Sequence, residues 1–276
     1  MQNHNHQKKI ALINDYTGFG RCSVAVQLPL ISALKVQCCP LPTSILSNHT
    51  GFDSFQFTDF TAQMQDYIDE WHKLGLNFSG ICTGFLGSAA QIAIVRGFIE
   101  RFGSKHTITV IDPVMGDYGK TYSTYTPEMC EKMKELTSLA NILTPNLTEA
   151  CILLDEPYDE KIKAEKVEKY AAALSEQGPE KVVITGIRQG SYIANFCYEK
   201  GGNIHIIRTH KIGTSRSGTG DIFSAIVAAD AVNGVEFSVS VRKASSFISR
   251  CIKKSIELNI PLTDGVCFEE VLHSLK

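Results

Sequence analysis

The chain has 276 residues, of which 43% are hydrophobic and 20% are charged. This composition is typical of a globular protein and excludes a long disordered, collagen-like or coiled-coil chain. The 27 basic and 29 acidic residues give a net charge of -2, so no basic surface indicates nucleic acid or a membrane as a partner. A small-molecule ligand is therefore expected, and the length fits a single large α/β domain.

The cysteines and the N-terminus indicate a reducing compartment. Nine cysteines are scattered along the chain without a Cys-x-x-Cys pair, which predicts neither a disulfide framework nor a zinc site. The first residues are polar and lack the apolar stretch of a secretory signal. No apolar run approaches the roughly 20 residues that span a bilayer. We therefore expect a cytoplasmic protein that does not bind a membrane.

Short apolar segments alternate with segments of helical periodicity. Strands are expected at 10–13, 80–82, 107–111, 141–143 and 182–184. Helices are expected at 59–74, 88–102, 127–139, 162–177, 219–233 and 237–258. Continuous apolar strands are buried on both faces, as in a parallel sheet. The alternation predicts an α/β fold with a doubly wound, mostly parallel sheet flanked by helices.

Two segments depart from this alternation. An antiparallel pair is expected at 192–198 and 204–207, and it argues against the closed barrel that the number of strands alone also allows. The segment 36–60 has strand-like runs, two prolines and many Ser and Thr residues, with no helix between the runs. We expect it to form a small β flap beside the main sheet, within one domain that covers residues 1–276.

The most informative motif is Ser217-Gly218-Thr219-Gly220-Asp221, directly before an apolar helix. Two glycines leave the first N–H groups of this helix open to a ligand, and its N-terminus carries a partial positive charge. The motif predicts an anion site formed by Gly218, Thr219 and Gly220. Asp221 could accept the proton of a hydroxyl group that receives a phosphoryl group. In isolation, Asp221 would be interpreted as a carboxylate that stabilises the start of the helix.

Three further motifs follow strands, at the sheet edge where doubly wound folds bind ligands. Asp112 and Asp117 lie in a loop shaped by Pro and Gly; they can hold Mg2+ directly or through water, or form a solvent-facing turn. Asn146 and Glu149 lie three residues apart at an expected helix start. Their side chains can share the water shell of a metal ion or form a capping box. Thr185 ends another strand and could donate a hydrogen bond to a phosphate.

In this order, the four motifs resemble those of the ribokinase-like superfamily, with its Gly-[Thr/Ala]-Gly-Asp anion hole and Asn-x-x-Glu magnesium motif. The resemblance extends over nearly the whole chain. Residues 47–50 (Ser-Asn-His-Thr) and 83–85 (Thr-Gly-Phe) are similar to segments of the pyridoxal kinase family. Residues 112–117 and 218–221 also have the form found in that family. The resemblance implies an enzyme that uses ATP to phosphorylate the 5'-hydroxymethyl group of pyridoxal, pyridoxine or pyridoxamine.

The resemblance also implies a role for each motif. Asp221 would be the catalytic base beside the anion hole. The residues expected around MgATP are Asp112, Asp117, Asn146, Glu149 and Thr185, with Asp112 and Glu149 holding Mg2+ through water. A monovalent cation is a further candidate cofactor.

The residues expected at the substrate are Asn14, Asp15, Thr43, His49 and Phe85. Thr43 would contact the pyridine ring and Phe85 would stack on it, whereas His49 could equally be a hydrogen-bonded structural histidine. Asn14 and Asp15 replace the Ser-His pair usual in the family and could bind the 3-hydroxyl group or the ring nitrogen. The flap 36–60 would cover the substrate and contribute to a homodimer.

Several alternatives stay open. A hydroxymethylpyrimidine kinase would share the fold and the anion hole, and a catalytically weak vitamin-binding protein would keep the pocket. The intact Asp221, Asn146 and Glu149 argue against the second alternative. A Walker-type P-loop is missing, and the Gly18-x-Gly20 segment lacks the third glycine of a dinucleotide fingerprint. Arg216, just before the anion hole, would touch a phosphate or face solvent.

Overall fold

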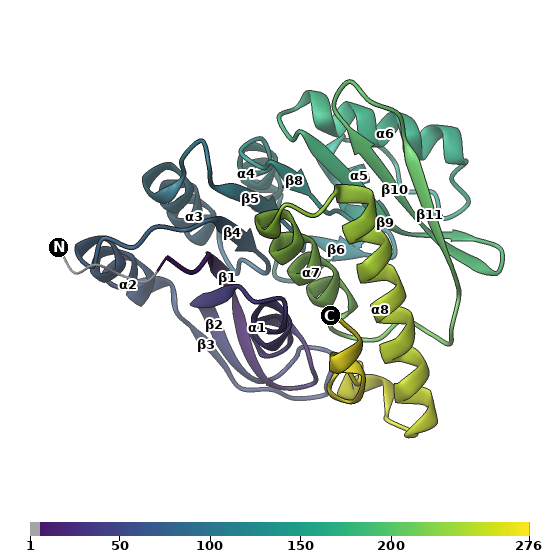
Figure 1. The fold of residues 1–276 in the computed structure, drawn as a ribbon, viewed down its shortest axis with the longest axis horizontal. Coiled ribbons are helices and arrows are strands. Elements are labelled where there is room, and N and C mark those ends of the chain that lie inside the picture. Colours follow the sequence, from purple (N-terminus) through teal and green to yellow (C-terminus); the bar gives the residue numbers. More distant parts are fainter. Residues whose placement is uncertain (1–5, 276) are drawn as a thin grey trace.

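The structure, a computed structural model, describes residues 6–275, in which helices cover both faces of one large sheet (Figure 1). This nine-stranded sheet has the order β11-β10-β9-β8-β5-β4-β1-β2-β3. Its strands are β1 Lys9–Phe19, β2 Gln37–Asn48, β3 Phe57–Asp59, β4 Gly80–Thr83, β5 Ile108–Ile111, β8 Ile142–Leu143, β9 Lys181–Gln189, β10 Tyr192–Glu199 and β11 His205–His210. Strands β2, β1, β4, β5, β8 and β9 are parallel to their neighbours in that order. The predicted doubly wound α/β fold is confirmed.

The helices form two layers, one on each face of the sheet. One layer contains α1 Ser23–Ala33, α7 Thr219–Asn233 and α8 Phe237–Glu257. The other layer contains α2 Thr61–Lys73, α3 Ala89–Phe102, α4 Pro127–Thr137, α5 Leu147–Leu153 and α6 Ala164–Glu176. None of the helices within residues 6–275 combines the length and the apolar composition needed to cross a bilayer.

The central strand β1 shows why both faces are buried. Its side chains at Ile10 and Leu12 pack with the α1, α7 and α8 layer, and those at Ala11 and Ile13 pack with the opposite layer. All four are fully buried, because successive side chains of a strand point to opposite faces and each face carries helices. An uninterrupted apolar run therefore marks a central strand here.

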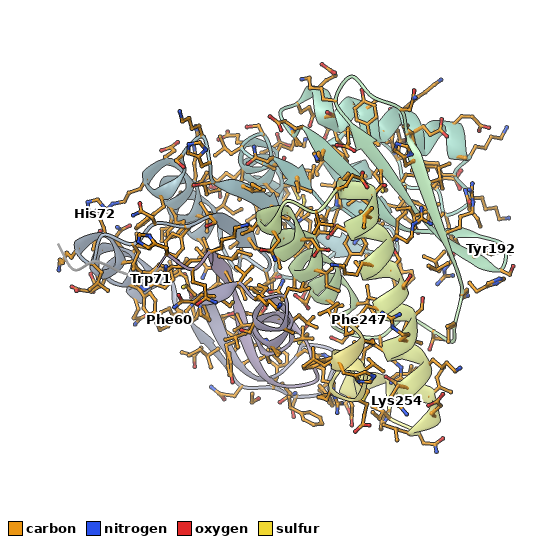
Figure 2. All side chains as sticks on the ribbon, in the orientation of Figure 1. Phe60, Trp71, His72, Tyr192, Phe247 and Lys254 are labelled. Atoms are coloured by element: carbon orange, nitrogen blue, oxygen red, sulfur yellow. The ribbon has the colours of Figure 1, made fainter. Side chains whose placement is uncertain are left out.

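Large aromatic side chains pack in both helix layers, among them Trp71 on α2 and Phe247 on α8 (Figure 2). The Trp71 ring on α2 lies 5.4 Å from the Phe78 ring and 6.2 Å from the Phe98 ring, between centroids. On the other face, Phe247 of α8 is fully buried. The side chains between the sheet and each helix layer thus form two separate hydrophobic cores, one on each face of the sheet.

Strands β2 and β3 occupy the segment predicted as a flap. β2 pairs in parallel with β1 along nearly its whole length, and β3 pairs antiparallel with β2 at the edge. The segment is therefore an extension of the main sheet and not a separate one. A small two-stranded hairpin, β6 Gly116–Asp117 and β7 Lys120–Thr121, lies apart from this sheet.

Helix α1 is the one long element that the sequence did not predict. Its residues are apolar on nearly every side and include Pro29, so they give neither a polar face nor a clear helical period. A helix with this composition is stable because it is covered by the sheet on one side and by α7 on another.

Candidate active site

The start of helix α7 has the geometry of an anion site. Gly218 precedes the helix with φ 85°, a left-handed conformation that favours glycine, and a Cβ atom there would overlap the carbonyl oxygen of Arg21. At Gly220, a Cβ atom would lie 3.9 Å from Oδ2 of Asp112, its nearest neighbour. The start of α7 therefore has little side-chain bulk, and Gly220 lies near the Asp112 carboxylate.

Asp221 lies in the first turn of α7 and faces strand β1 and the start of α1. Its Oδ1 atom accepts a hydrogen bond from Asn14 Nδ2 at 3.1 Å, and the backbone N–H of Ser23 also donates to its carboxylate. Burial raises the pKa of Asp221 to about 6, and these donors oppose the shift. A carboxylate with this pKa is ionised near neutral pH and can accept a proton.

Two more carboxylates, Asp112 and Glu149, are buried beside this helix start. Burial, followed by repulsion from Glu149 and Asp221, raises the pKa of Asp112 well above its usual range. Burial raises the pKa of Glu149 to about 7, although the backbone N–H groups of Asn146 and Met115 donate to it at 2.8 and 3.0 Å. A bound cation would relieve this repulsion, so the donor chemistry fits Mg2+.

Asn146 and Glu149 form the capping box of helix α5. Asn146 Oδ1 accepts from the Glu149 N–H at 3.0 Å, and Glu149 Oε2 accepts from the Asn146 N–H. Asn146 Nδ2 also donates to the carbonyl of Gly116 at 2.8 Å, which holds the β6–β7 hairpin. In the described part of the chain, no three His, Cys, Asp or Glu side chains are arranged to hold a metal directly. Any metal here would depend on ligand oxygens and water for most of its coordination.

These motifs meet at one cavity of about 620 Å3, at the carboxyl ends of the parallel strands. The predicted residues that line it are Asp112, Asp117, Asn146, Glu149, Thr185, Gly218, Thr219, Gly220 and Asp221. Thr185 lies where β9 bridges to Asn146, with its N–H donating to the carbonyl of Pro145 at 2.9 Å. Asp117 is exposed on the β6–β7 hairpin, and partial burial of its carboxyl raises the pKa.

The cavity also has walls that the sequence did not predict. Ile193 of β10 and Ile248 and Ile252 of α8 line it, together with the aromatic residues Tyr118 and Tyr158. The α8 side chains are distant in sequence from every motif, whereas Tyr118 directly follows Asp117. A helical apolar face such as that of α8 predicts a core contact and gives no signal that part of it faces a cavity.

The residues predicted at the substrate lie on the other side of Asp221. Thr43 on β2 donates through Oγ1 to the carbonyl of Phe85 at 2.9 Å, and the Phe85 N–H donates to Asn14 Oδ1 at 2.7 Å. Thr43 is fully buried, and Phe85 is half-buried at the end of β4. Neither residue lines the 620 Å3 cavity. Asn14 connects the two parts of the site, because it contacts both Phe85 and the cavity residue Asp221.

Asp15 and His49 have protein partners of their own. The Asp15 carboxylate accepts from Thr17 Oγ1 at 2.6 Å, and burial raises its pKa. The His49 ring accepts from the Gly51 N–H at Nδ1, 3.0 Å away, so its Nε2 donates to the carbonyl of Thr263 at 2.7 Å. Both ring nitrogens of His49 are thus used by the backbone, as in the structural alternative.

Arg216 does not face solvent, and its guanidinium group is bound by the C-terminal segment. It is buried, with 9% exposure, and donates to the carbonyl oxygens of Pro261 at 2.8 Å, Ile260 at 2.9 Å and Gly265 at 3.2 Å. The same segment, 260–265, also accepts from His49 and from Arg21. Of the two interpretations drawn from sequence, the solvent-facing one was wrong, and contact with a phosphate stays a prediction because Arg216 also lines the cavity.

Comparisons with known proteins agree with this geometry. The sequence model of the phosphomethylpyrimidine kinase family matches residues 28–263. A pyridoxal kinase of Arabidopsis thaliana is 33% identical over 199 residues, which cover 68% of this chain and 62% of that protein. A pyridoxine kinase of Bacillus subtilis is 31% identical over 189 residues, 67% of this chain and 68% of that protein. A crystal structure of a Bacteroides thetaiotaomicron protein, described as a phosphomethylpyrimidine kinase, is in a form with pyridoxal. Its sequence is 37% identical and its TM-score is 0.94, over 98% of this chain and 96% of that one.

Proposed function

The chain belongs to the phosphomethylpyrimidine kinase family, and from this premise we propose that it transfers the γ-phosphoryl group of ATP to the 5'-hydroxymethyl group of a B6 vitamer. Its predicted resemblance to pyridoxal kinases, and with it the prediction of an enzyme of that kind, is confirmed by relatives named pyridoxal kinase and pyridoxine kinase. The observation that carries the specific proposal is the position of Asp221. It stands between a cavity that ends at the N-terminus of α7 and the Thr43–Phe85 side of the site.

The cavity fits a nucleoside triphosphate. Its isoleucine walls on β10 and α8 suit a flat base, and the glycine-flanked start of α7 suits the phosphates. Asp112 and Glu149 would hold Mg2+ through water, and the ion would neutralise charge on the phosphoryl oxygens. A monovalent cation belongs to the same proposal as a second counter-ion for the phosphates. The protein's own contribution is the row of N–H groups of Gly218, Thr219 and Gly220, which would stabilise negative charge as it develops.

Asp221 would act as the general base. Its carboxylate would accept the hydroxyl proton of the vitamer as the oxygen forms a bond to phosphorus. Thr43 and Phe85 would hold the pyridine ring, Phe85 through its half-buried aromatic face, with Asp15 and His49 at the edge of the pocket. The pyridoxal in the Bacteroides thetaiotaomicron crystal form supports a vitamer as the alcohol.

A second candidate substrate is hydroxymethylpyrimidine. Two bacterial hydroxymethylpyrimidine/phosphomethylpyrimidine kinases are 24% identical over 248 residues and 27% identical over 182 residues. The matching family is likewise named after a pyrimidine substrate, phosphomethylpyrimidine. Both alcohols present a hydroxymethyl group on a flat nitrogen heterocycle, so the anion site and Asp221 would serve either one.

The experiment is a comparison of acceptors. Purified protein is assayed for ATP consumption with pyridoxal, pyridoxine, pyridoxamine and hydroxymethylpyrimidine at equal concentrations. We expect the highest kcat/KM with one of the three vitamers. A much higher kcat/KM with the pyrimidine would replace the vitamer by the second candidate, and the absence of turnover with all four would contradict the proposed function.

We also propose that the protein is a cytoplasmic homodimer whose interface includes the β2–β3 edge of the sheet. Exposed Ile45 and Phe57 project from these strands, and Tyr16 and Phe19 from the neighbouring end of β1 are exposed as well. An edge strand with exposed apolar side chains is covered in most stable proteins. Sedimentation velocity of the protein and of Phe57→Glu tests this, since the substitution should yield a monomer.

A further inference from the structure

Asn14 has a hydrogen-bond arrangement that differs from that of a ligand-binding residue. It is 1% exposed at the end of the apolar part of β1. Its Nδ2 atom donates to Gln27 Oε1 at 2.8 Å and to Asp221 Oδ1 at 3.1 Å. Its Oδ1 atom accepts from the N–H of Phe85 at 2.7 Å and of Asp15 at 2.9 Å. Two backbone donors on one side and two oxygen acceptors on the other fix which atom is oxygen and which is nitrogen.

This arrangement uses the full hydrogen-bonding capacity of the amide. A side-chain amide has two donor hydrogens and two acceptor lone pairs, and all four are occupied by the protein. A ring nitrogen or hydroxyl group of a substrate could bind Asn14 only by displacing one of them. The role at the pyridine ring predicted from the sequence is therefore replaced by a role inside the protein.

The orientation of Asn14 is fixed by a second buried amide. Gln27 on α1 has no exposed surface, and its Nε2 atom donates to Ser224 Oγ at 3.1 Å. Ser224 lies three residues after Asp221 on α7, and its hydroxyl group donates to the carbonyl of Gly220 at 3.1 Å. A closed circuit of hydrogen bonds through the buried Ser224, Gln27 and Asn14 thus runs from α7 through α1 and β1 back to α7. Such a circuit is rigid because breaking one contact leaves a buried polar atom without a partner.

The local backbone is shaped for this contact. A Cβ atom at Gly84, the residue after β4, would overlap the Asn14 amide, so a glycine here lets the backbone approach that amide closely. The register between β1 and β2 shifts between Asn14 and Tyr16, which marks a bulge at this point of β1. Bulges often re-aim a side chain next to an active site.

We propose that Asn14 is a positioning residue for the reaction: by donating to Oδ1 of Asp221 it orients this carboxylate toward the hydroxyl group of the substrate. Through its own Oδ1 atom it fixes the Phe85 peptide, so the base and the aromatic residue beside the ring keep a constant separation. This inference rests on the proposed function of Asp221 as base. It makes no demand on which alcohol is phosphorylated.

A double-mutant cycle tests this role. Asn14→Asp keeps an oxygen for the Phe85 and Asp15 N–H groups and removes the donor to Asp221. In the parent, we expect this variant to lower kcat by about 30-fold or more, with the KM for ATP within about twofold. In the Asp221→Asn background, we expect the same substitution to lower kcat by less than about threefold, because residues that act through one group are not additive.

Controls separate positioning from folding. Asn141→Asp makes the same chemical change at an amide whose Oδ1 accepts a backbone N–H, that of Thr109 at 2.8 Å, outside the cavity lining. It should leave kcat within about twofold of the parent. If Asn14→Asp does not fold by circular dichroism, Gln27→Met replaces it in the cycle, since that change frees the Asn14 amide. We expect a loss of about threefold to tenfold in the parent and none in the Asp221→Asn background.

The cycle is measured with whichever of the four alcohols the parent phosphorylates fastest. A wrong vitamin assignment therefore changes the acceptor and leaves the cycle intact. An equal loss of kcat in both backgrounds would show that Asn14 acts only on folding, and an unchanged kcat in the parent would remove it from the mechanism. Either result overturns the inference, whereas a loss confined to the background with an intact Asp221 supports it.

Discussion

Replacement of Arg216 by methionine should destabilise the protein through the segment 260–265. The guanidinium group donates to three backbone carbonyl oxygens, and a hydrogen bond from a charged donor contributes about 1.5–3 kcal/mol. The methionine side chain can fill the space of the arginine stem and removes the cost of burying a charge. Water can also reach part of the freed segment, since Leu262 is exposed. We therefore expect a loss of about 3 kcal/mol in the free energy of unfolding, below the sum of the three bonds.

The assay is equilibrium unfolding in urea, followed by fluorescence and circular dichroism. A loss of about 3 kcal/mol corresponds to a decrease of about 6 °C or more in Tm for a chain of this size. The matched control is Arg208→Met, because Arg208 is exposed and donates through Nε to one side chain, Gln189, at 2.8 Å. Its effect should lie within about 0.5 kcal/mol. If both variants unfold at the same urea concentration as the parent, the reasoning about the Arg216 contacts is refuted.

Three further predictions concern the reaction. The first is that kcat/KM falls below about pH 6. The pKa of Asp221 is raised to about 6, so its carboxylate becomes protonated there and can no longer accept a proton. A flat profile between pH 5 and 8 would contradict this. Glu149→Gln should raise the Mg2+ concentration for half-maximal rate, since a glutamine keeps the capping box with Asn146 but has no charge. An unchanged Mg2+ titration would leave Asn146 and Glu149 with the capping role alone. Phe85→Ala should weaken vitamer binding by about 1–3 kcal/mol through lost ring contact, with little change in the KM for ATP, and an effect on ATP alone would remove Phe85 from the substrate pocket.

The fold and one half of the site could be predicted from the sequence. The motifs at Asp112 and Asn146 each follow a strand, and parallel strands place their carboxyl ends at one edge of a sheet. Thr185, expected where a strand ends, lies within β9, which continues to Gln189. The Gly218–Asp221 motif meets them because α7 packs across the same sheet. Local sequence was sufficient here, since each residue is placed by its own strand or helix.

The roles of Asn14 and Arg216 could not be predicted in this way. Asn14 contacts a carboxylate 207 residues further along the chain, and Arg216 contacts carbonyl groups of the C-terminal segment. Both side chains have polar groups that can bind a ligand, and both lie next to sequence motifs of the site. The sequence alone therefore favours a ligand contact for each of them. Only the packed structure shows that the Asn14 amide is fully used by the protein and that the Arg216 guanidinium donates to three backbone carbonyl groups.

The central claim is that Asp221 is the base in phosphoryl transfer to a hydroxymethyl group, and direct observation of the product tests it. The parent and Asp221→Asn are incubated with MgATP and the preferred vitamer, and the phosphorylated vitamer is quantified by mass spectrometry over time. We expect the parent to form the 5'-phosphate, and the variant to form it about 100-fold more slowly while it still binds MgATP in a separate titration. Equal rates of product formation by the two proteins would contradict the claim.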